Sequence, residues 1–377
     1  MSINGYLRNL SLALWVCSFS LPANSLSLAK GEAVTIWPAR VTSQSVMIGD
    51  YQGFNCLKAP PPAYTGPLQI DSKYDQGDQT KSSLKRLSRD SEQIRNKLME
   101  YHRGLQETVT RFERAKNAEE VNYSLACLDQ WLNAWANPGA LLSTDASSTG
   151  KAVRKWSLAA IASGLLKVRA LSDNRYELSA GQRKWLEALA GAVIADYGSR
   201  QTLDFAWFNN HDYWSAWAVS GTGMLLGRDD YLQWADTTLH LALRQITPGM
   251  AGDYAQLPQE TARGSLAVEY THYALVPLVL LVESAEVNGR PLNTAERQQL
   301  AQLANFAVIG VLNPEQLPEL VRQQERPGGH KMSWLLPFLK QQPDHQRALS
   351  LLREQGDDVG SYSQIGGDIR FFYPGVE

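Results

Sequence analysis

The sequence predicts an all-α protein. From residue 82 onward, apolar side chains recur three or four positions apart, which is the spacing of one face of a helix. Capping residues and glycine or proline stops divide these runs into helices of ordinary length with short links. Strands and helices do not alternate, and no glycine-rich phosphate-binding loop is present. Because no linker follows residue 80, we predict one domain over residues 30–377.

Residues 1–29 have the pattern of a secretory signal peptide. Arg8 gives the start a positive charge, and residues 10–21 are apolar but too few to span a bilayer. Small residues that suit a cleavage site follow at Ser25 and Ala29. No later stretch is judged apolar enough for a membrane helix, so no membrane partner is expected. The mature protein is expected to be soluble and periplasmic or secreted.

Removal of this peptide leaves two cysteines, Cys56 and Cys127. In an oxidising compartment two cysteines favour a disulfide, and two buried thiols are the alternative. The bond would tie the segment after the N-terminus to an early helix. Closing a loop of this length contributes roughly 4 kcal/mol in the chain-entropy model.

The chain from residue 30 to residue 80 is predicted to be irregular, because Pro60, Pro61 and Pro62 exclude a helix. Long loops in compact domains often cover binding sites, so residues 56–80 are interpreted as a lid. Main helices are predicted over residues 82–117, 118–135, 147–171 and 179–197, from the window 208–217 to about 227, and over 231–246, 261–285 and 294–311. Shorter helical pieces are predicted over 314–324, 334–340 and 346–354, and β-like alternation over 359–373.

The window 208–217 concentrates two amides, an imidazole, a carboxylate and large aromatic rings. Helical spacing places Asn210, Trp214 and Trp217 on one stripe, with His211 beside it. Amides that bind a carboxylate, a base near neutrality and rings that stack on sugars suit an acidic carbohydrate. The alternative is a capped helix start with tryptophans in the core and a structural histidine.

Two further groups of residues are candidates for the same site. If residues 261–285 are helical, Arg263 and Tyr270 share a face and reach one pocket past the small Ala267; an exposed arginine and a core tyrosine are the alternative. Lys151 and Arg154 lie at a predicted helix start, where cations are unfavourable unless an anion binds nearby. A solvated helix face is the alternative for this basic cluster.

Composition excludes several functional classes. The chain has a net charge of −2, so it is no generally basic nucleic-acid binder, and an anionic partner needs a local cluster of cations. No His-Glu-x-x-His or paired-cysteine motif occurs, so we expect no metal and no cofactor. The Gly-x-Ser-x-Gly motif of serine hydrolases is absent. A glycosidase with two facing carboxylates stays open, with Asp212 as one candidate.

These motifs, in this order, resemble the mannuronate-preferring alginate lyases, polysaccharide lyase family five. The resemblance is carried by residues 60–66 with 72–74, 149–156, 209–217 and 263–275. It implies an incomplete α/α toroid of helical hairpins in an exported enzyme, and it supports the Cys56–Cys127 disulfide. It also implies catalytic roles for Asn210, His211, Arg263 and Tyr270, with Lys73 from the lid.

Three positions depart from the family pattern. Asp212 stands where the family has serine, Thr271-His272 replaces His-Asn, and Gln364 replaces an arginine near the C-terminus. The loss of that cation bears on substrate preference.

The implied reaction is β-elimination on poly-β-D-mannuronate, an anionic polysaccharide. Asn210 and Arg263 would neutralise the uronate carboxylate, and Tyr270 would act as base and acid, with Arg263 lowering the pKa of its phenol. His211 is the alternative base, or a neutral donor. Tyr74, Trp214 and Trp217 are expected to stack on sugar rings, and Lys151 and Arg154 to bind the chain. A lyase for another polyuronate such as glucuronan, or a non-catalytic polysaccharide-binding protein, is the alternative, and a monomer is expected.

Overall fold

The computed structural model describes Met1 and residues 33–376, apart from 203 and 321–322. The predicted signal peptide lies outside the described residues, except for Met1. By its backbone contacts the chain divides into Met1–Lys30 and Gly31–Glu377, and the second unit contains every element below.

This unit is all-α, as predicted. Its helices are α1 (Ser43–Val46), α2 (Arg89–Arg114), α3 (Ala118–Ala136), α4 (Ser148–Leu171), α5 (Ala180–Tyr197), α6 (Asn210–Leu226), α7 (Asp229–Arg244), α8 (Pro258–Thr261), α9 (Ala267–Val287), α10 (Thr294–Leu312), α11 (Leu335–Gln341) and α12 (Gln346–Gln355). Short 3₁₀ turns include η1 (Gly198–Arg200), η2 (Gly264–Leu266), η3 (Pro314–Gln316) and η6 (Ser363–Ile365). Two antiparallel pairs of two-residue strands complete it, β1 (Thr247–Pro248) with β2 (Ala255–Gln256) and β3 (Ser361–Tyr362) with β4 (Gly367–Asp368).

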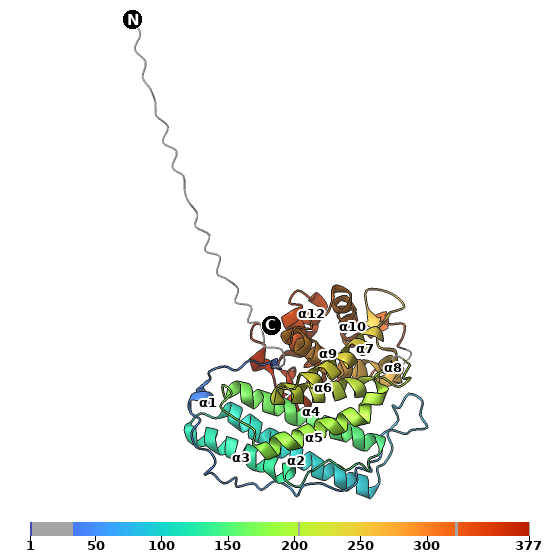
Figure 1. The fold of residues 1–377 in the computed structure, drawn as a ribbon. Helices are drawn as coiled ribbons and strands as arrows, with labels where there is room; N and C mark the ends of the chain where they lie inside the picture. The colour runs from blue at the N-terminus through green and yellow to red at the C-terminus, as the bar shows by residue number, and fades with distance from the viewer. Residues whose placement is uncertain (2–32, 203, 321–322, 377) are drawn as a thin grey trace. The chain divides into compact units, whose positions relative to one another are not determined.

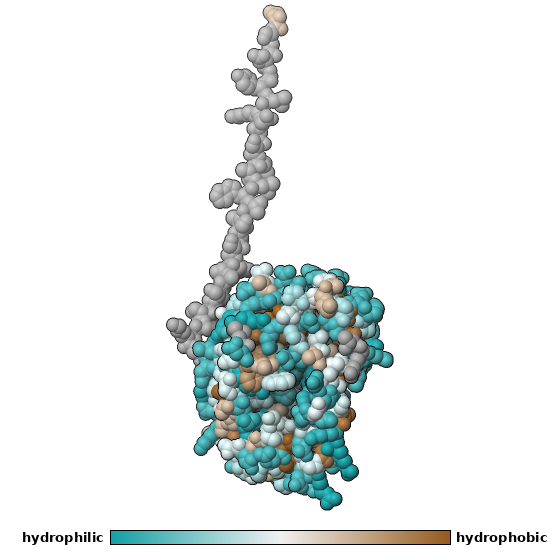
Figure 2. Space-filling view, turned by 90° about the vertical axis from the view of Figure 1, so that its right-hand side faces the viewer, coloured by the Kyte–Doolittle hydropathy of each residue, from teal (hydrophilic) through white to brown (hydrophobic). Residues whose placement is uncertain are grey.

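Helix α6 is the centre of the core. It packs against α4, α5, α7 and α9, and every residue from Asp212 to Leu225 is buried. Figure 1 shows the helices stacked roughly in chain order, with α4 and α6 between α2–α3 and α9–α12. Figure 2 shows one face of the molecule, which is mainly hydrophilic with apolar residues scattered over it. A helix buried on all sides needs no polar face, so its amphipathic pattern is weak.

Most predicted helices lie within a few residues of the observed ones, with three exceptions. Helix α2 begins at Arg89 rather than 82, because residues 82–85 pair with the predicted lid instead. The predicted helix 261–285 is broken at Gly264, whose φ is +61°, so Arg263 precedes α9. The predicted helical piece 314–324 contains only the short turn η3.

The predicted disulfide is present. Cys56 and Cys127 are bonded, with their Cα atoms 4.9 Å apart. The bond fastens the chain before the prolines to α3. From there the backbone of Leu68 pairs with Asp145 and Ser147, and Gly150 of α4 lies so close to the Leu68 carbonyl that a Cβ would clash with it. Cys56 and Leu68 are therefore held against the helices, and the lid over residues 56–80 stays a prediction.

One helix passes the length and composition test for a membrane span, contrary to the sequence prediction. Among the described residues this is Gly264–Val287, which contains α9. Of its apolar window, 78% is buried inside the protein. Its apolar character is accounted for by packing against α6, α7 and α10.

Candidate active site

A cavity of about 1470 Å³ is lined by α2, α4, the start of α6, the α8–α9 connection, the C-terminal segment and residues 72–81. Among its lining residues are nine lysines and arginines but only three glutamates. The cations are Lys73, Lys81, Arg95, Arg103, Arg111, Arg114, Arg200, Arg263 and Lys331. A chain of net charge −2 therefore concentrates positive charge in one cleft, which suits a polyanion.

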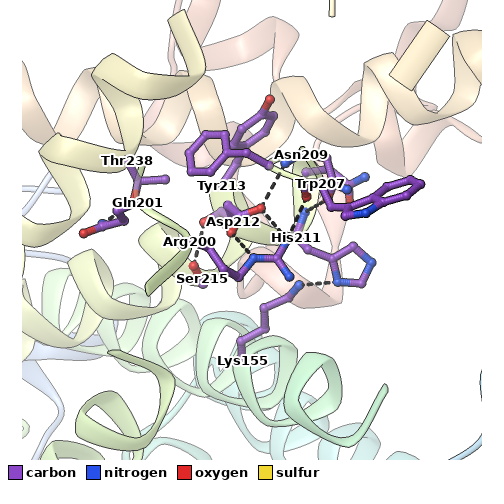
Figure 3. Close-up of polar contacts among 12 residues, drawn as sticks. Lys155, Arg200, Gln201, Trp207, Asn209, His211, Asp212, Tyr213, Ser215 and Thr238 are labelled. Atoms are coloured by element: carbon purple, nitrogen blue, oxygen red, sulfur yellow. Dashed lines mark hydrogen bonds and ion pairs between the residues drawn. The ribbon is translucent and has the colours of Figure 1, made fainter. Parts of the chain in front are cut away.

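The start of α6 is held by reciprocal capping. The Asn209 side chain accepts from the backbone N–H of His211 at 2.9 Å, and the Asp212 carboxylate accepts from the Asn209 N–H at 2.9 Å. Asp212 also accepts two hydrogen bonds from Arg200, at 2.7 and 2.8 Å (Figure 3). The family departure at Asp212 is thus a structural anchor that ties α6 to η1, and it argues against a glycosidase acid in this place.

Asn210 is held by a carboxylate that the sequence analysis missed. Glu260 of α8 is buried and accepts from the Asn210 backbone N–H at 2.7 Å and from its Nδ2 at 3.0 and 2.9 Å. The Asn210 Oδ1 atom is buried without a partner among the described residues. Burial raises the pKa of Glu260 to about 7, against the hydrogen bonds from Asn210 and the charge of Arg263.

His211 is held by a lysine. The Lys155 Nζ of α4 lies 2.8 Å from the His211 Nδ1 (Figure 3). Burial, and then the positive charges of Lys155, Arg200 and Arg263, lower the pKa of His211 well below its usual value. The imidazole is therefore neutral at physiological pH.

Arg263 and Tyr270 line the same cavity and contact each other. The Arg263 guanidinium carbon lies 3.8 Å from the centre of the Tyr270 ring, and the hydroxyl oxygens of Tyr270 and Tyr74 are 2.9 Å apart. Burial raises the pKa of Tyr270 well above 10, although Arg263 opposes this. Arg263 lowers the pKa of Tyr270, as expected, but in the substrate-free protein desolvation of the phenolate outweighs the arginine charge, so the net shift is upward.

Residues 72–85 form a hairpin that lines the cavity. Tyr74 bridges Leu84, and the Arg263 guanidinium donates to the Lys81 carbonyl at 2.7 Å. Lys73 also lines the cavity, with its Nζ 4.8 Å from the Tyr74 ring centre. This hairpin contains the residues of the predicted lid that line the cavity.

Trp214 and Trp217 are not on the cavity surface. Both are 0% exposed in the core, and the Trp217 Nε1 donates to the Ser163 hydroxyl at 3.0 Å. The prediction that they stack on sugars was wrong, because α6 is enclosed on every side.

Arg154 and Lys151 do not line the cavity either. Arg154 is 3% exposed; it donates to the Leu141 and Ser143 carbonyls and pairs with Asp196. Lys151 is half exposed and lies 3.6 Å from the same carboxylate. The predicted role of Arg154 in substrate binding was wrong, because this buried side chain ties the α3–α4 loop to α5. The role of Lys151 stays a prediction.

Two other tryptophans, Trp207 and Trp156, line the cavity, whereas Trp214 and Trp217 do not. Trp207 is 61% exposed and lines the cavity, with its carbonyl held by Arg200 at 2.8 Å. Trp156 lines it from α4, with its Nε1 unpartnered among the described residues. Trp207 was not predicted as a site residue because its exposure distinguishes it from the buried tryptophans, and exposure cannot be read from the sequence.

In the part of the chain that the structure describes, no group of three or more His, Cys, Asp and Glu side chains is placed to hold a metal ion. The polar groups that line the cavity include the Asn210 amide, the neutral His211 imidazole, the Arg263 guanidinium and the Tyr74 and Tyr270 phenols. Such a set can neutralise a carboxylate and move protons.

Comparison with known proteins places this arrangement in a family. An alginate lyase of Pseudomonas fluorescens strain SBW25 is 32% identical over 303 residues, which cover 77% of this chain and 76% of that protein. Alginate lyase A1-III from Sphingomonas species A1 has a TM-score of 0.63 at 18% identity, covering 90% of this chain and 92% of that chain. A variant of A1-III complexed with a tetrasaccharide has a TM-score of 0.65 at 16% identity. The match covers 90% of this chain and 91% of that chain.

The shared fold is the incomplete α/α toroid of helical hairpins. The sequence model described as "Alginate lyase" matches residues 69–317, which include the hairpin, the start of α6 and the α8–α9 connection. On this match over most of its length, and on relatives at about 30% identity, the chain belongs to the alginate lyase family.

Proposed function

We propose that the protein cleaves alginate by β-elimination and that its preferred substrate is poly-β-D-mannuronate. The observation that carries the proposal is the meeting of Asn210 and His211 with Arg263 and Tyr270 in one cation-lined cavity. The two pairs come from segments about fifty residues apart, yet Glu260 contacts Asn210 while Arg263 acts on the pKa of both Glu260 and His211.

The first chemical task is to neutralise the uronate carboxylate, because its charge makes the neighbouring C5 proton a poor acid. Arg263 supplies a charge-assisted hydrogen bond and His211 a neutral one. For Asn210 to add another, its Nδ2 would have to exchange a hydrogen bond with Glu260 for one to the substrate. These groups are held before substrate arrives, so little reorganisation is needed in the transition state.

Tyr270 then performs both proton transfers. Its phenolate takes the C5 proton, the C4–C5 double bond forms as the C4–O4 bond breaks, and the resulting phenol protonates O4. In mannuronan the C5 proton and O4 lie on one face of the ring, so a single phenol suffices. The products are a 4,5-unsaturated uronate end and a new reducing end.

The test is the ultraviolet absorbance of an unsaturated uronate, followed on poly-mannuronate, poly-guluronate and glucuronan. We expect the fastest increase on poly-mannuronate. If the absorbance increases fastest on another polymer, that polymer is the preferred substrate instead. Binding of a polymer without any increase in absorbance would favour a non-catalytic polysaccharide-binding protein.

Trp207 is expected to act as a platform for one sugar ring. Because stacking on an exposed indole is worth about 1–2 kcal/mol, Trp207→Ala should raise KM roughly 5–30-fold with little change in kcat. The measurement is initial rate against substrate concentration. Phe371, which is 48% exposed and does not line the cavity, gives the matched control Phe371→Ala. Equal KM values in the two variants would contradict the platform role.

We also propose that the protein is exported to the periplasm after cleavage of residues 1–29, and acts there as a monomer. The Cys56–Cys127 disulfide supports this, since such bonds persist in oxidising compartments. The mass of the protein recovered from the periplasmic fraction should correspond to a start near residue 24 to 30. Recovery of the uncleaved chain from the cytoplasm alone would contradict export.

A further inference from the structure

We propose that Lys155 is a positioning residue that fixes His211 as a neutral hydrogen-bond donor, with the imidazole proton on Nε2. The inference rests on the proposed function, because the group that His211 is inferred to contact is the uronate carboxylate of the substrate. It goes further in assigning Lys155 and in excluding His211 as the base.

The contact links the tautomer of His211 to the charge of Lys155. The Lys155 Nζ approaches the His211 Nδ1 to 2.8 Å, as the dashed line in Figure 3 shows. A charged lysine carries N–H donors and no lone pair, so beside it Nδ1 accepts; the charged form of Lys155 is part of the proposal. A neutral imidazole that accepts at Nδ1 carries its one proton on Nε2.

Burial and the neighbouring charges act in opposite directions on the Lys155 amine, and the net effect is a pKa well below the ordinary value of a lysine. Lys155 is 0% exposed, and burial lowers its pKa, as does Arg200 of η1. Asp212 of α6 and Glu260 of α8 raise that pKa. The ring centres of Trp156 and Tyr197 lie 4.8 and 5.0 Å from Nζ, where their faces stabilise a cation.

The far side of the imidazole is left for a ligand. His211 lines the cavity, and its Nε2 has no hydrogen bond to any described residue. Burial, and then the cations Lys155, Arg200 and Arg263, lower the pKa of the imidazole and keep the ring neutral. An N–H aimed into a cationic cavity suits the uronate carboxylate and offers no lone pair for the C5 proton. Tyr270 is then the remaining base.

The decisive experiment is long-range ¹⁵N–¹H correlation NMR of the histidine-labelled protein without substrate. The His211 signals are identified by their loss in His211→Asn. We expect the pattern of an Nε2–H tautomer, unchanged between pH 5 and pH 8. An Nδ1–H pattern, or titration of His211 within that range in the unaltered protein, would overturn the inference.

Lys155→Met tests the cause, because methionine keeps the length and apolar stem but donates nothing. We expect a mixed tautomer pattern and a His211 pKa displaced toward its ordinary value. The kcat on poly-mannuronate should fall on the order of 10–100-fold, as when residues that orient a ligand histidine are removed. The control is Lys167→Met, since Lys167 is a second fully buried lysine of α4 that pairs with Glu113. It should leave the His211 spectrum unchanged.

An unchanged His211 spectrum in Lys155→Met would contradict the positioning role. If that variant does not fold, the tautomer in the unaltered protein still decides the question. The tautomer is measured without substrate, so a wrong tautomer and an absence of lyase activity are separate results.

Discussion

Replacing Tyr270 by Phe is expected to lower kcat by at least about 10³-fold while KM stays within roughly threefold. The hydroxyl that is lost performs both proton transfers, whereas the ring that stacks on Arg263, at 3.8 Å, is kept. Rates are measured by the absorbance of the unsaturated product. The matched control is Tyr74→Phe, which removes the hydroxyl that Tyr270 contacts at 2.9 Å but not the proposed base. Its kcat should change by less than about tenfold, because Tyr74 transfers no proton in the mechanism.

The pH dependence supplies a second readout for Tyr270. Burial holds its pKa above 10, so the phenolate is the minor form near neutrality. The rate in the unaltered protein should therefore rise with pH between about 7 and 9, up to tenfold per pH unit. A Tyr270→Phe protein with near-normal turnover, or a rate that falls over this range, would reject the tyrosine as base.

Replacing Glu260 by Ala is expected to lower kcat on the order of 10²–10³-fold, as when a transition-state donor is misplaced. Glu260 accepts three hydrogen bonds from Asn210, and without them the amide loses its orientation and the backbone N–H has no acceptor. The unfolding free energy should also fall, by about 1–3 kcal/mol. Glu260→Gln, which keeps the shape and one acceptor oxygen, should retain more of both. An alanine variant as active as the glutamine variant would show that Glu260 does not orient Asn210.

The same carboxyl predicts how stability depends on pH. Glu260 holds its proton up to about pH 7 in the folded protein, but only to its ordinary pKa of 4.5 when unfolded. Between these values the folded state binds more protons, so stability falls as pH rises, by about 3 kcal/mol over the window. Chemical denaturation at pH 4.5 and 7.5 measures this. Between these pH values the unfolding free energy of Glu260→Gln should fall by about 3 kcal/mol less than that of the unaltered protein. Equal falls in the variant and the unaltered protein would contradict the raised pKa of Glu260.

The fold class was predictable because helix periodicity and capping are local properties of the chain. The Asn209 cap, the Gly227 stop with φ of +71° and the Ser147 and Ser179 caps all follow from short windows. The start of α2 was misplaced because residues 82–85 satisfy their backbone groups in the lid hairpin, a choice that depends on distant partners.

The site was predictable where residue types meet in a short window, and not where burial decides. Asn210 and His211 were found together, but Trp214 shares their helix and lies in the core. Residues at helical spacing share one face of a helix, but when the helix is enclosed the spacing does not show whether that face lies against the core or the cavity. Lys155 and Glu260 were missed because a buried lysine and a buried glutamate have the same local sequence signature as exposed ones. Their roles appear only through contacts about fifty residues away.

The hairpin that lines the cavity has a consequence for turnover. The Lys81 carbonyl holds the Arg263 guanidinium, and the Tyr74 hydroxyl meets that of Tyr270. Lifting the hairpin to admit or discharge a polymer removes both contacts at once. Arg263 and Tyr270 therefore keep these two partners only while the hairpin lies against the cavity, which makes the arrangement of both side chains depend on the hairpin's position.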